Sequence, residues 1–127
     1  MSIQCSKSEK KEILNRIKET VDVDEILKYT QYQDNDIRLK AVGELCPCKV
    51  QEDNKEFWDR VFQMVDDPDA KIRARILHII CDGSPDRLEL QVSEALERFN
   101  RDTDRDIKRQ AHKVLASYTR TGKWNIL

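Results

Sequence analysis

A repeat with a period of 35 residues constrains the fold of this 127-residue chain more than any other feature. Its three copies are "QDNDIRLKAVGEL" from Gln33, "PDAKIRARILHII" from Pro68 and "TDRDIKRQAHKVL" from Thr103, and they align without gaps. Each copy has an Asp, then three residues later an Ile followed by Arg or Lys, and an aliphatic residue at its end. A period of roughly 20 to 50 residues is typical of solenoids, in which each repeat is one supersecondary unit.

Each repeat reads as a pair of helices. Ile72, Ile76 and Ile80 recur at the i, i+4, i+8 spacing of one helix face. A second helical pattern precedes each copy, with Ile26, Val61 and Leu96 one period apart. In "CDGSPDRL", Gly83 is expected to end one helix, with Ser84 capping the next and Pro85 at its first position. The predicted helices cover residues 8–20, 23–32, 37–46, 54–65, 70–82, 85–100 and 105–119, and residues 1–6 are expected to be loose.

Composition agrees with an all-α fold. The chain is 37% charged and 39% hydrophobic, and it has three Gly and three Pro, too few for many strand turns. A length of 127 residues suits a single domain spanning residues 1–127. The first residues lack the continuous apolar run of a signal peptide, and no apolar run is long enough for a membrane span. We therefore expect a cytoplasmic protein without a membrane partner.

The Asp-rich turn followed by an aliphatic residue and Arg or Lys, as in "DPDAKIRARIL", resembles the HEAT-repeat family over roughly residues 22–119. The resemblance implies an α-solenoid of about three helix pairs, roughly residues 22–46, 54–82 and 85–119, with the helix at residues 8–20 as an N-terminal cap. It also implies that the turn Asp and the following basic residue tie neighbouring repeats together. Those positions are Asp34, Asp69, Asp104, Arg38, Arg73 and Lys108. Independently, an Asp just before a helix can accept the unpaired backbone N–H groups of the first turn.

The segment after the last repeat holds Trp124, two residues beyond Gly122. An open solenoid end needs covering, so residues 120–127 are predicted to form a short C-terminal cap. A partner-binding peptide is the alternative, since terminal segments are often loose unless docked.

Catalytic and metal-binding patterns are weak. The enzymes among HEAT-like proteins that hydroxylate substrates use adjacent His-Glu pairs, and this sequence has none; His78 and His112 occupy different repeat columns. Cys46 and Cys81 are one period apart, hence on stacked helices roughly 8 to 10 Å apart, whereas a disulfide needs Cα atoms within about 7 Å. We expect these two thiols to be reduced and buried, and we assign no role to Cys5 or Cys48. The chain is predicted not to be an enzyme and to bind no cofactor or metal.

Charge is segregated between the two helices of each pair, although the net charge is only −1. The first helices are acidic, and the second helices carry the basic residues. The HEAT resemblance implies that second helices line the concave surface, where a basic ridge would consist of Lys40, Lys71, Arg75, His78, Arg109 and Lys113. This pattern predicts a scaffold or adaptor that binds an acidic protein segment. A nucleic-acid-binding solenoid is the alternative, an accessory lyase or metal-dependent enzyme ranks lower, and a solvated face with no partner is the plainest explanation.

Overall fold

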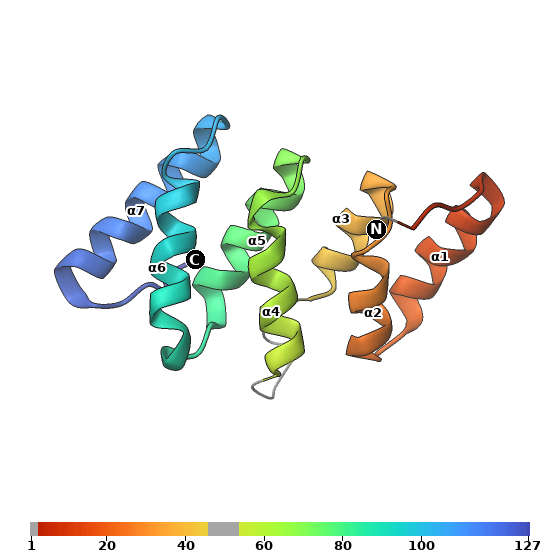
Figure 1. The fold of residues 1–127 in the computed structure, drawn as a ribbon, viewed down its shortest axis with the longest axis horizontal. Helices are drawn as coiled ribbons and strands as arrows, with labels where there is room; N and C mark the ends of the chain where they lie inside the picture. The colour runs from red at the N-terminus through yellow and green to blue at the C-terminus, as the bar shows by residue number, and fades with distance from the viewer. Residues whose placement is uncertain (1–2, 46–53) are drawn as a thin grey trace. The chain divides into compact units, whose positions relative to one another are not determined.

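The computed structural model describes residues 3–45 and 54–127 and confirms that the chain is all-α (Figure 1). Cys46, Pro47 and Cys48, the "CPC" segment, lie outside the described residues. The chain divides into two compact units, Met1–Glu52 and Asp53–Leu127, and each is described by itself. None of the helices in the described ranges combines the length and apolar character needed to cross a membrane.

The first unit contains three helices, α1 (Lys7–Glu19), α2 (Val23–Tyr29) and α3 (Asn35–Gly43). Both α1 and α2 pack on α3. Each helix begins after a polar cap, respectively Ser6, Asp22 and Asp34, whose side chain accepts a backbone N–H of the first turn. The buried apolar residues of this unit are Ile17, Ile26, Ile37, Ala41, Val42 and Leu45.

The segment before α1 is bonded to the turn between α2 and α3. The Ile3 N–H donates to the Gln31 carbonyl at 3.0 Å, and the Gln33 N–H donates to the Ile3 carbonyl at 2.7 Å. Together these bonds form an isolated bridge. The expectation that residues 1–6 are loose is therefore wrong for residues 3–6, because backbone pairing fixes Ile3 and capping fixes Ser6.

Glu25 on α2 accepts four hydrogen bonds, two of which come from Arg16 on α1. Arg16 donates to both of its oxygens, from Nε at 2.7 Å and from Nη2 at 3.0 Å, and the hydroxyls of Thr20 and Tyr29 donate at 2.7 and 3.0 Å. These donors, the Arg16 guanidinium first among them, lower the Glu25 pKa from 4.5 to about 2. The ionised Glu25 carboxylate therefore stabilises the folded state at pH values above its pKa in the unfolded chain. This stabilisation is lost as the pH falls from about 4.5 to about 2.

We expect an NMR titration of the Glu25 carboxyl to give a pKa of about 2. Replacing Arg16 with Gln removes the largest cause of the shift, so the same titration in that variant should give a higher value. Glu25→Gln should flatten the loss of stability across this acidic range, measured by urea unfolding at each pH. A Glu25 pKa near 4.5 in the unmodified chain would contradict the hydrogen-bonded geometry.

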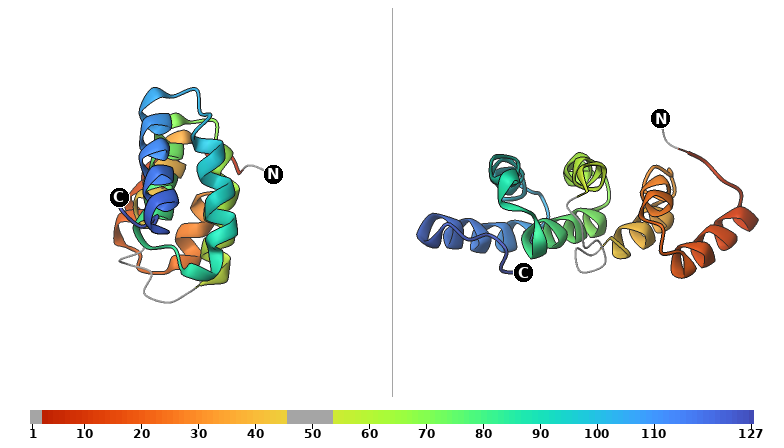
Figure 2. Two further views of the ribbon diagram at one scale, coloured as in Figure 1. Left: turned by 90° about the vertical axis from the view of Figure 1, so that its left-hand side faces the viewer. Right: turned by 90° about the horizontal axis from the view of Figure 1, so that it is seen from below.

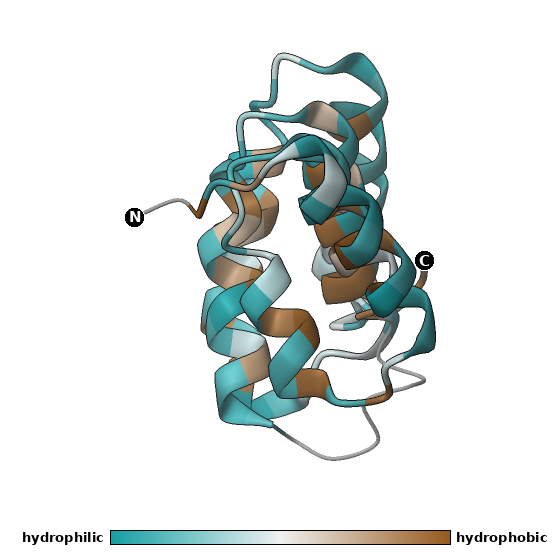
Figure 3. Cartoon of the chain, turned by 90° about the vertical axis from the view of Figure 1, so that its right-hand side faces the viewer, coloured by the Kyte–Doolittle hydropathy of each residue, from teal (hydrophilic) through white to brown (hydrophobic). Residues whose placement is uncertain are grey.

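The second unit has two layers of helices. It consists of α4 (Lys55–Gln63) with the 3-10 turn η1 (Met64–Asp66), α5 (Ala70–Gly83), the 3-10 turn η2 (Asp86–Leu88) with α6 (Glu89–Phe99), and α7 (Arg105–Thr121). Figure 2 shows α4 and α6 in one layer and α5 and α7 in the other. Hydrophobic and hydrophilic residues are interspersed along the helices of the chain (Figure 3). The core between the layers includes Phe57, Val61, Ile72, Ile76, Ile80, Leu96, Phe99, Ile107 and Ala111.

The connection between α5 and α6 confirms the sequence expectation only in part: α5 ends at Gly83 as predicted, but the next helix begins differently. Ser84 does not cap the following helix; its hydroxyl donates to the Ile80 carbonyl at 2.6 Å, one turn back. Pro85 is extended, and a 3-10 turn without a side-chain cap leads into α6. The Ser84 hydroxyl also accepts a hydrogen bond from the Trp124 indole Nε1 at 2.7 Å, so it joins α5 to the C-terminal tail.

The tail docks on this same connection. Gly122 ends α7 with a φ of 75°, a left-handed conformation that glycine adopts without strain. Trp124 is then 5% exposed, and its ring lies edge-on to Tyr118 at 5.8 Å. Asn125 exchanges hydrogen bonds with the Ser84 backbone, and the Leu127 N–H donates to the Cys81 carbonyl. The tail thus covers the end of α5 beside α7.

Candidate interaction surface

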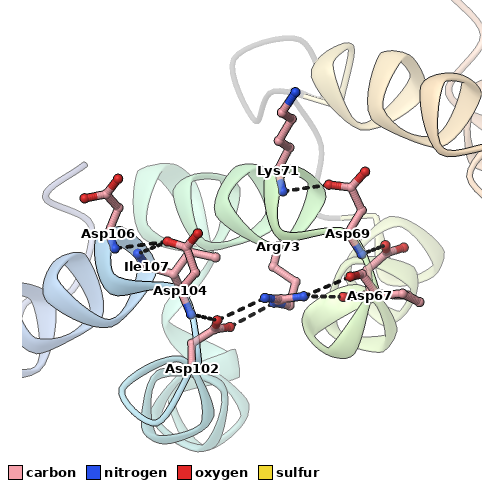
Figure 4. A network of polar contacts seen from close by, with 9 residues as sticks. Asp67, Asp69, Lys71, Arg73, Asp102, Asp104, Asp106 and Ile107 are labelled. Carbon is pink, nitrogen blue, oxygen red and sulfur yellow. Dashed lines mark hydrogen bonds and ion pairs between the residues drawn. The ribbon is translucent and has the colours of Figure 1, made fainter.

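Three aspartates one period apart begin the second helices. Asp34 caps α3 and Asp104 caps α7, each accepting two backbone N–H groups at 2.9 to 3.1 Å. Asp69 caps α5 by accepting the Lys71 N–H at 2.8 Å (Figure 4). These carboxylates cap their own helices and help to begin them. Asp34 also forms an ion pair with Lys10 of α1 at 3.0 Å, so it joins two helices of the first unit.

A different aspartate joins the two helix pairs of the second unit. Arg73 on α5 forms a bidentate pair with Asp102, from Nε at 2.9 Å and from Nη2 at 3.0 Å (Figure 4). Its Nη1 donates to the carbonyls of Asp67 and Pro68 at 2.9 and 3.3 Å. The Asp102 hydrogen bond raises the pKa of the Arg73 guanidinium. Burial raises the pKa of Asp102, but Arg73 and the Asp104 N–H outweigh it, and the net direction is downward.

A second acidic column of the repeat contains Asp102. Asp67 and Asp102 are one period apart, each two residues before a capping Asp, in "DPD" and "DTD". Each carboxylate accepts the N–H of that capping residue, at 2.9 Å for Asp67 and 2.8 Å for Asp102. The first repeat has Tyr32 at this position. The column is acidic in only two of the three copies, so it is not part of the pattern that all three share.

The other two basic positions of the predicted ladder are placed differently. Arg38 donates to the carbonyls of Tyr32 and Gln33 in the turn before α3, and to the side chain of Asn35, the first residue of α3. Lys108 is exposed and forms no ion pair among the described residues. It lies on α7, the last helix of the unit, so the ammonium group is part of the surface.

The predicted ridge residues fall into both units. Lys71, Arg75 and His78 lie on the exposed side of α5, and Arg109 and Lys113 lie on the exposed side of α7. These two helices contact each other directly. Lys40 is half-buried on α3 and belongs to the first unit, so it is described separately from the other five. Two carboxylates interrupt the positive charge. Asp82 is one turn after His78 on α5, and Asp106 accepts a 2.6 Å bond from Arg109.

The exposed side of α7 carries more positive charge than the ridge prediction included. Its buried positions are Ile107, Ala111 and Val114, and its exposed positions also include Arg105, Lys108, His112 and Arg120. On α5, the residues one period before Lys108 and His112 are Arg73 and Leu77, which point inward. The repeat pattern therefore did not indicate that Lys108 and His112 are exposed. The basic surface of the second unit therefore comprises Lys71, Arg75, His78, Arg105, Lys108, Arg109, His112, Lys113 and Arg120.

The two cysteines that the structure describes have different settings. Cys81 is fully buried, and burial raises its thiol pKa to about 12, so the reactive thiolate is scarce near neutral pH. Cys5 is half-buried. The expectation for Cys46, and the question of Cys48, fall outside the described residues. Within residues 3–45 and 54–127, no three His, Cys, Asp or Glu side chains are grouped so that they could hold a metal ion.

A scan against protein-family models and searches of curated proteins and of solved structures gave no match to this chain. The charge and geometry of its surfaces are therefore the basis for assigning a function.

Proposed function

We propose that this protein is an interaction scaffold or adaptor, and that its basic surface binds an acidic segment of a protein partner. The observation that carries the proposal is the set of nine exposed basic side chains on α5 and α7, two helices that contact each other and whose acidic residues are Asp82 and Asp106. Exposed positive charge of this density attracts acidic segments and steers their association. Because α5 and α7 are rigid neighbouring helices, they would hold these positive charges in a fixed arrangement.

The proposed architecture is a short HEAT-like α-solenoid. Its support is the 35-residue repeat, the matching Asp caps of α3, α5 and α7, and the Arg73–Asp102 pair between successive helix pairs of the second unit. Repeat proteins of this kind offer extended surfaces for partners. A scaffold function fits that architecture better than a catalytic one, because binding along a surface needs no enclosed pocket.

Nucleic acid is the second candidate, and the number of Arg and Lys side chains on α7 favours it. Two observations favour the protein partner instead. The whole chain has a net charge of −1, so long-range attraction to a polyanion is weak. The basic surface contains no Phe, Tyr or Trp on which unpaired bases would stack.

Reversing two charges, Arg75→Glu with Lys113→Glu, should reduce binding of a fluorescein-labelled acidic peptide of Glu and Gly by roughly tenfold, about 1.4 kcal/mol. Both side chains are exposed, so the free energy of unfolding should change by less than about 0.5 kcal/mol. Binding is measured by fluorescence anisotropy between about 50 and 300 mM salt, and the wild-type affinity should weaken as salt screens the charges.

Lys7→Glu with Lys11→Glu is the matched control, because it changes the net charge equally on exposed positions of α1. Unchanged peptide binding in the Arg75 and Lys113 variant would show that the surface is only solvated. Equal weakening in both variants would show an effect of net charge alone. Sub-micromolar binding to a DNA duplex, with a steep linear fall of log affinity against log salt, would favour the nucleic-acid function instead.

A further inference from the structure

A groove lies between α4 and α6, in the layer of the second unit that does not carry the basic surface. A hollow of about 610 Å³ is bordered by Phe62 and Val65 from the α4 side and by Ala95 from α6. Phe62 is half-buried, and its ring is tilted against that of Trp58, with ring centroids 6.4 Å apart. Phe62, Val65 and Ala95 form the floor of the groove; Val65 and Ala95 are each only 4% exposed, so the Phe62 ring is its main apolar surface, and the other lining residues are polar or charged. The hollow is large enough for one or two apolar side chains of a ligand.

One end of this groove is positively charged. A second hollow of about 270 Å³ shares Val65, Arg98 and Arg101 with the first and is also lined by Arg73. Arg73 is occupied by Asp102, and Arg98 pairs with Asp66 at 2.6 Å. Arg101 is exposed and has no carboxylate partner among the described residues; its Nε makes only a long bond of 3.3 Å to the Glu97 carbonyl. This end can therefore accept one carboxylate from a ligand.

The remaining charge along the groove is negative. Glu94 and Glu97 border the larger hollow, both are exposed, and neither has an ion-pair partner among the described residues. A uniformly acidic segment would be repelled there. The ligand that fits must instead place apolar side chains over the floor and a carboxylate at the Arg101 end, which differs from the chemistry of the basic surface.

We propose that the groove between α4 and α6 binds a short peptide segment in which one or two large apolar residues are followed closely by an Asp or Glu. The apolar side chains contact Phe62, Val65 and Ala95, and the carboxylate pairs with Arg101. The groove is separate from the basic surface, so this proposal does not depend on whether the basic surface binds an acidic partner. A protein with both sites would hold two segments on opposite layers.

The test selects peptides from a random phage-displayed library against the full chain and then measures synthetic copies of the enriched sequences by isothermal titration calorimetry. We expect the enriched peptides to share an apolar residue with an Asp or Glu within three positions. In ¹⁵N NMR spectra, their amide shifts should concentrate at Phe62, Val65, Ala95 and Arg101. Replacing the peptide's acidic residue by Lys should abolish detectable binding.

Arg101→Glu should weaken these peptides at least tenfold, whereas Arg120→Glu, an exposed reversal on the basic surface, should change their affinity less than twofold. Arg101→Lys keeps the charge and should retain most of the binding. The proposal is overturned if no sequence is enriched, if the enriched peptides lack the acidic residue, or if they lose affinity in Arg120→Glu and keep it in Arg101→Glu. The last result would assign the peptides to the basic surface.

Discussion

Replacing Trp124 with Ala is expected to lower the free energy of unfolding by about 3 to 5 kcal/mol, the usual cost of truncating a buried Trp. The indole is 5% exposed, its Nε1 donates to the Ser84 hydroxyl, and its ring packs edge-on against Tyr118. Removal of the side chain leaves a cavity between α7 and the end of α5. It also removes the donor to a buried hydroxyl, which adds to the loss.

Urea unfolding monitored by circular dichroism measures this effect. Ile126→Ala is the matched control within the tail, because Ile126 is 39% exposed and should cost far less. Deleting residues 123–127 leaves Gly122 to end α7 and should destabilise the protein at least as much as Trp124→Ala. If the truncated chain unfolds at the same urea concentration as the full chain, the tail does not stabilise the second unit.

Much of the local structure could be predicted because it depends on interactions close in sequence. The i, i+4, i+8 spacing of Ile72, Ile76 and Ile80 predicted the buried side of α5, and all three are fully buried. The Asp before each second helix caps it through N–H groups two or three residues away. Ser84 was predicted wrongly because its partner, Trp124, is 40 residues distant in sequence, and no local pattern reports such a bond.

The candidate surfaces were predictable to different degrees. Lys71, Arg75 and His78 follow from helical periodicity, since the apolar side of α5 leaves them on the exposed side. The exposure of Lys108 and His112 could not be predicted in this way, because their equivalent positions on α5 pack inward, whereas on α7, the last helix, they are exposed. The groove between α4 and α6 depends on how two helices of different pairs pack, and the sequence alone does not give their separation.

The second large effect is expected at the ion pair between Arg73 and Asp102. The two side chains are only 15% and 8% exposed, and the guanidinium is held by four hydrogen bonds to Asp102, Asp67 and Pro68. Asp102→Ala leaves the Arg73 charge partly buried without its carboxylate. Breaking such a pair by removing one partner costs about 3 to 5 kcal/mol.

Asp66→Ala is the matched control, since the Asp66–Arg98 pair joins the same two helix pairs but is 63% and 59% exposed. Exposed pairs contribute about 0 to 1 kcal/mol, so this change should be small. If Asp102→Ala and Asp66→Ala lower the free energy of unfolding by similar amounts, burial does not determine how strongly these ion pairs stabilise the protein. The free energy of unfolding is measured in urea at pH 7. Arg73→Met and the double variant Arg73→Met with Asp102→Ala complete a double-mutant cycle, which gives the interaction energy of the Arg73–Asp102 pair.

Acid should remove the same interaction without any substitution. The pKa of Asp102 is lowered in the folded protein, so its stabilising effect is complete well above the ordinary value of 3.8 and is lost as the pH falls below it. The difference in unfolding free energy between the wild type and Asp102→Ala should therefore shrink steadily on acidification. Because Arg73 stays charged throughout, protonation of Asp102 removes the negative charge that pairs with it, as the substitution does. A difference that stays constant from pH 7 to the acid transition would mean that the Asp102 carboxylate charge does not stabilise the fold.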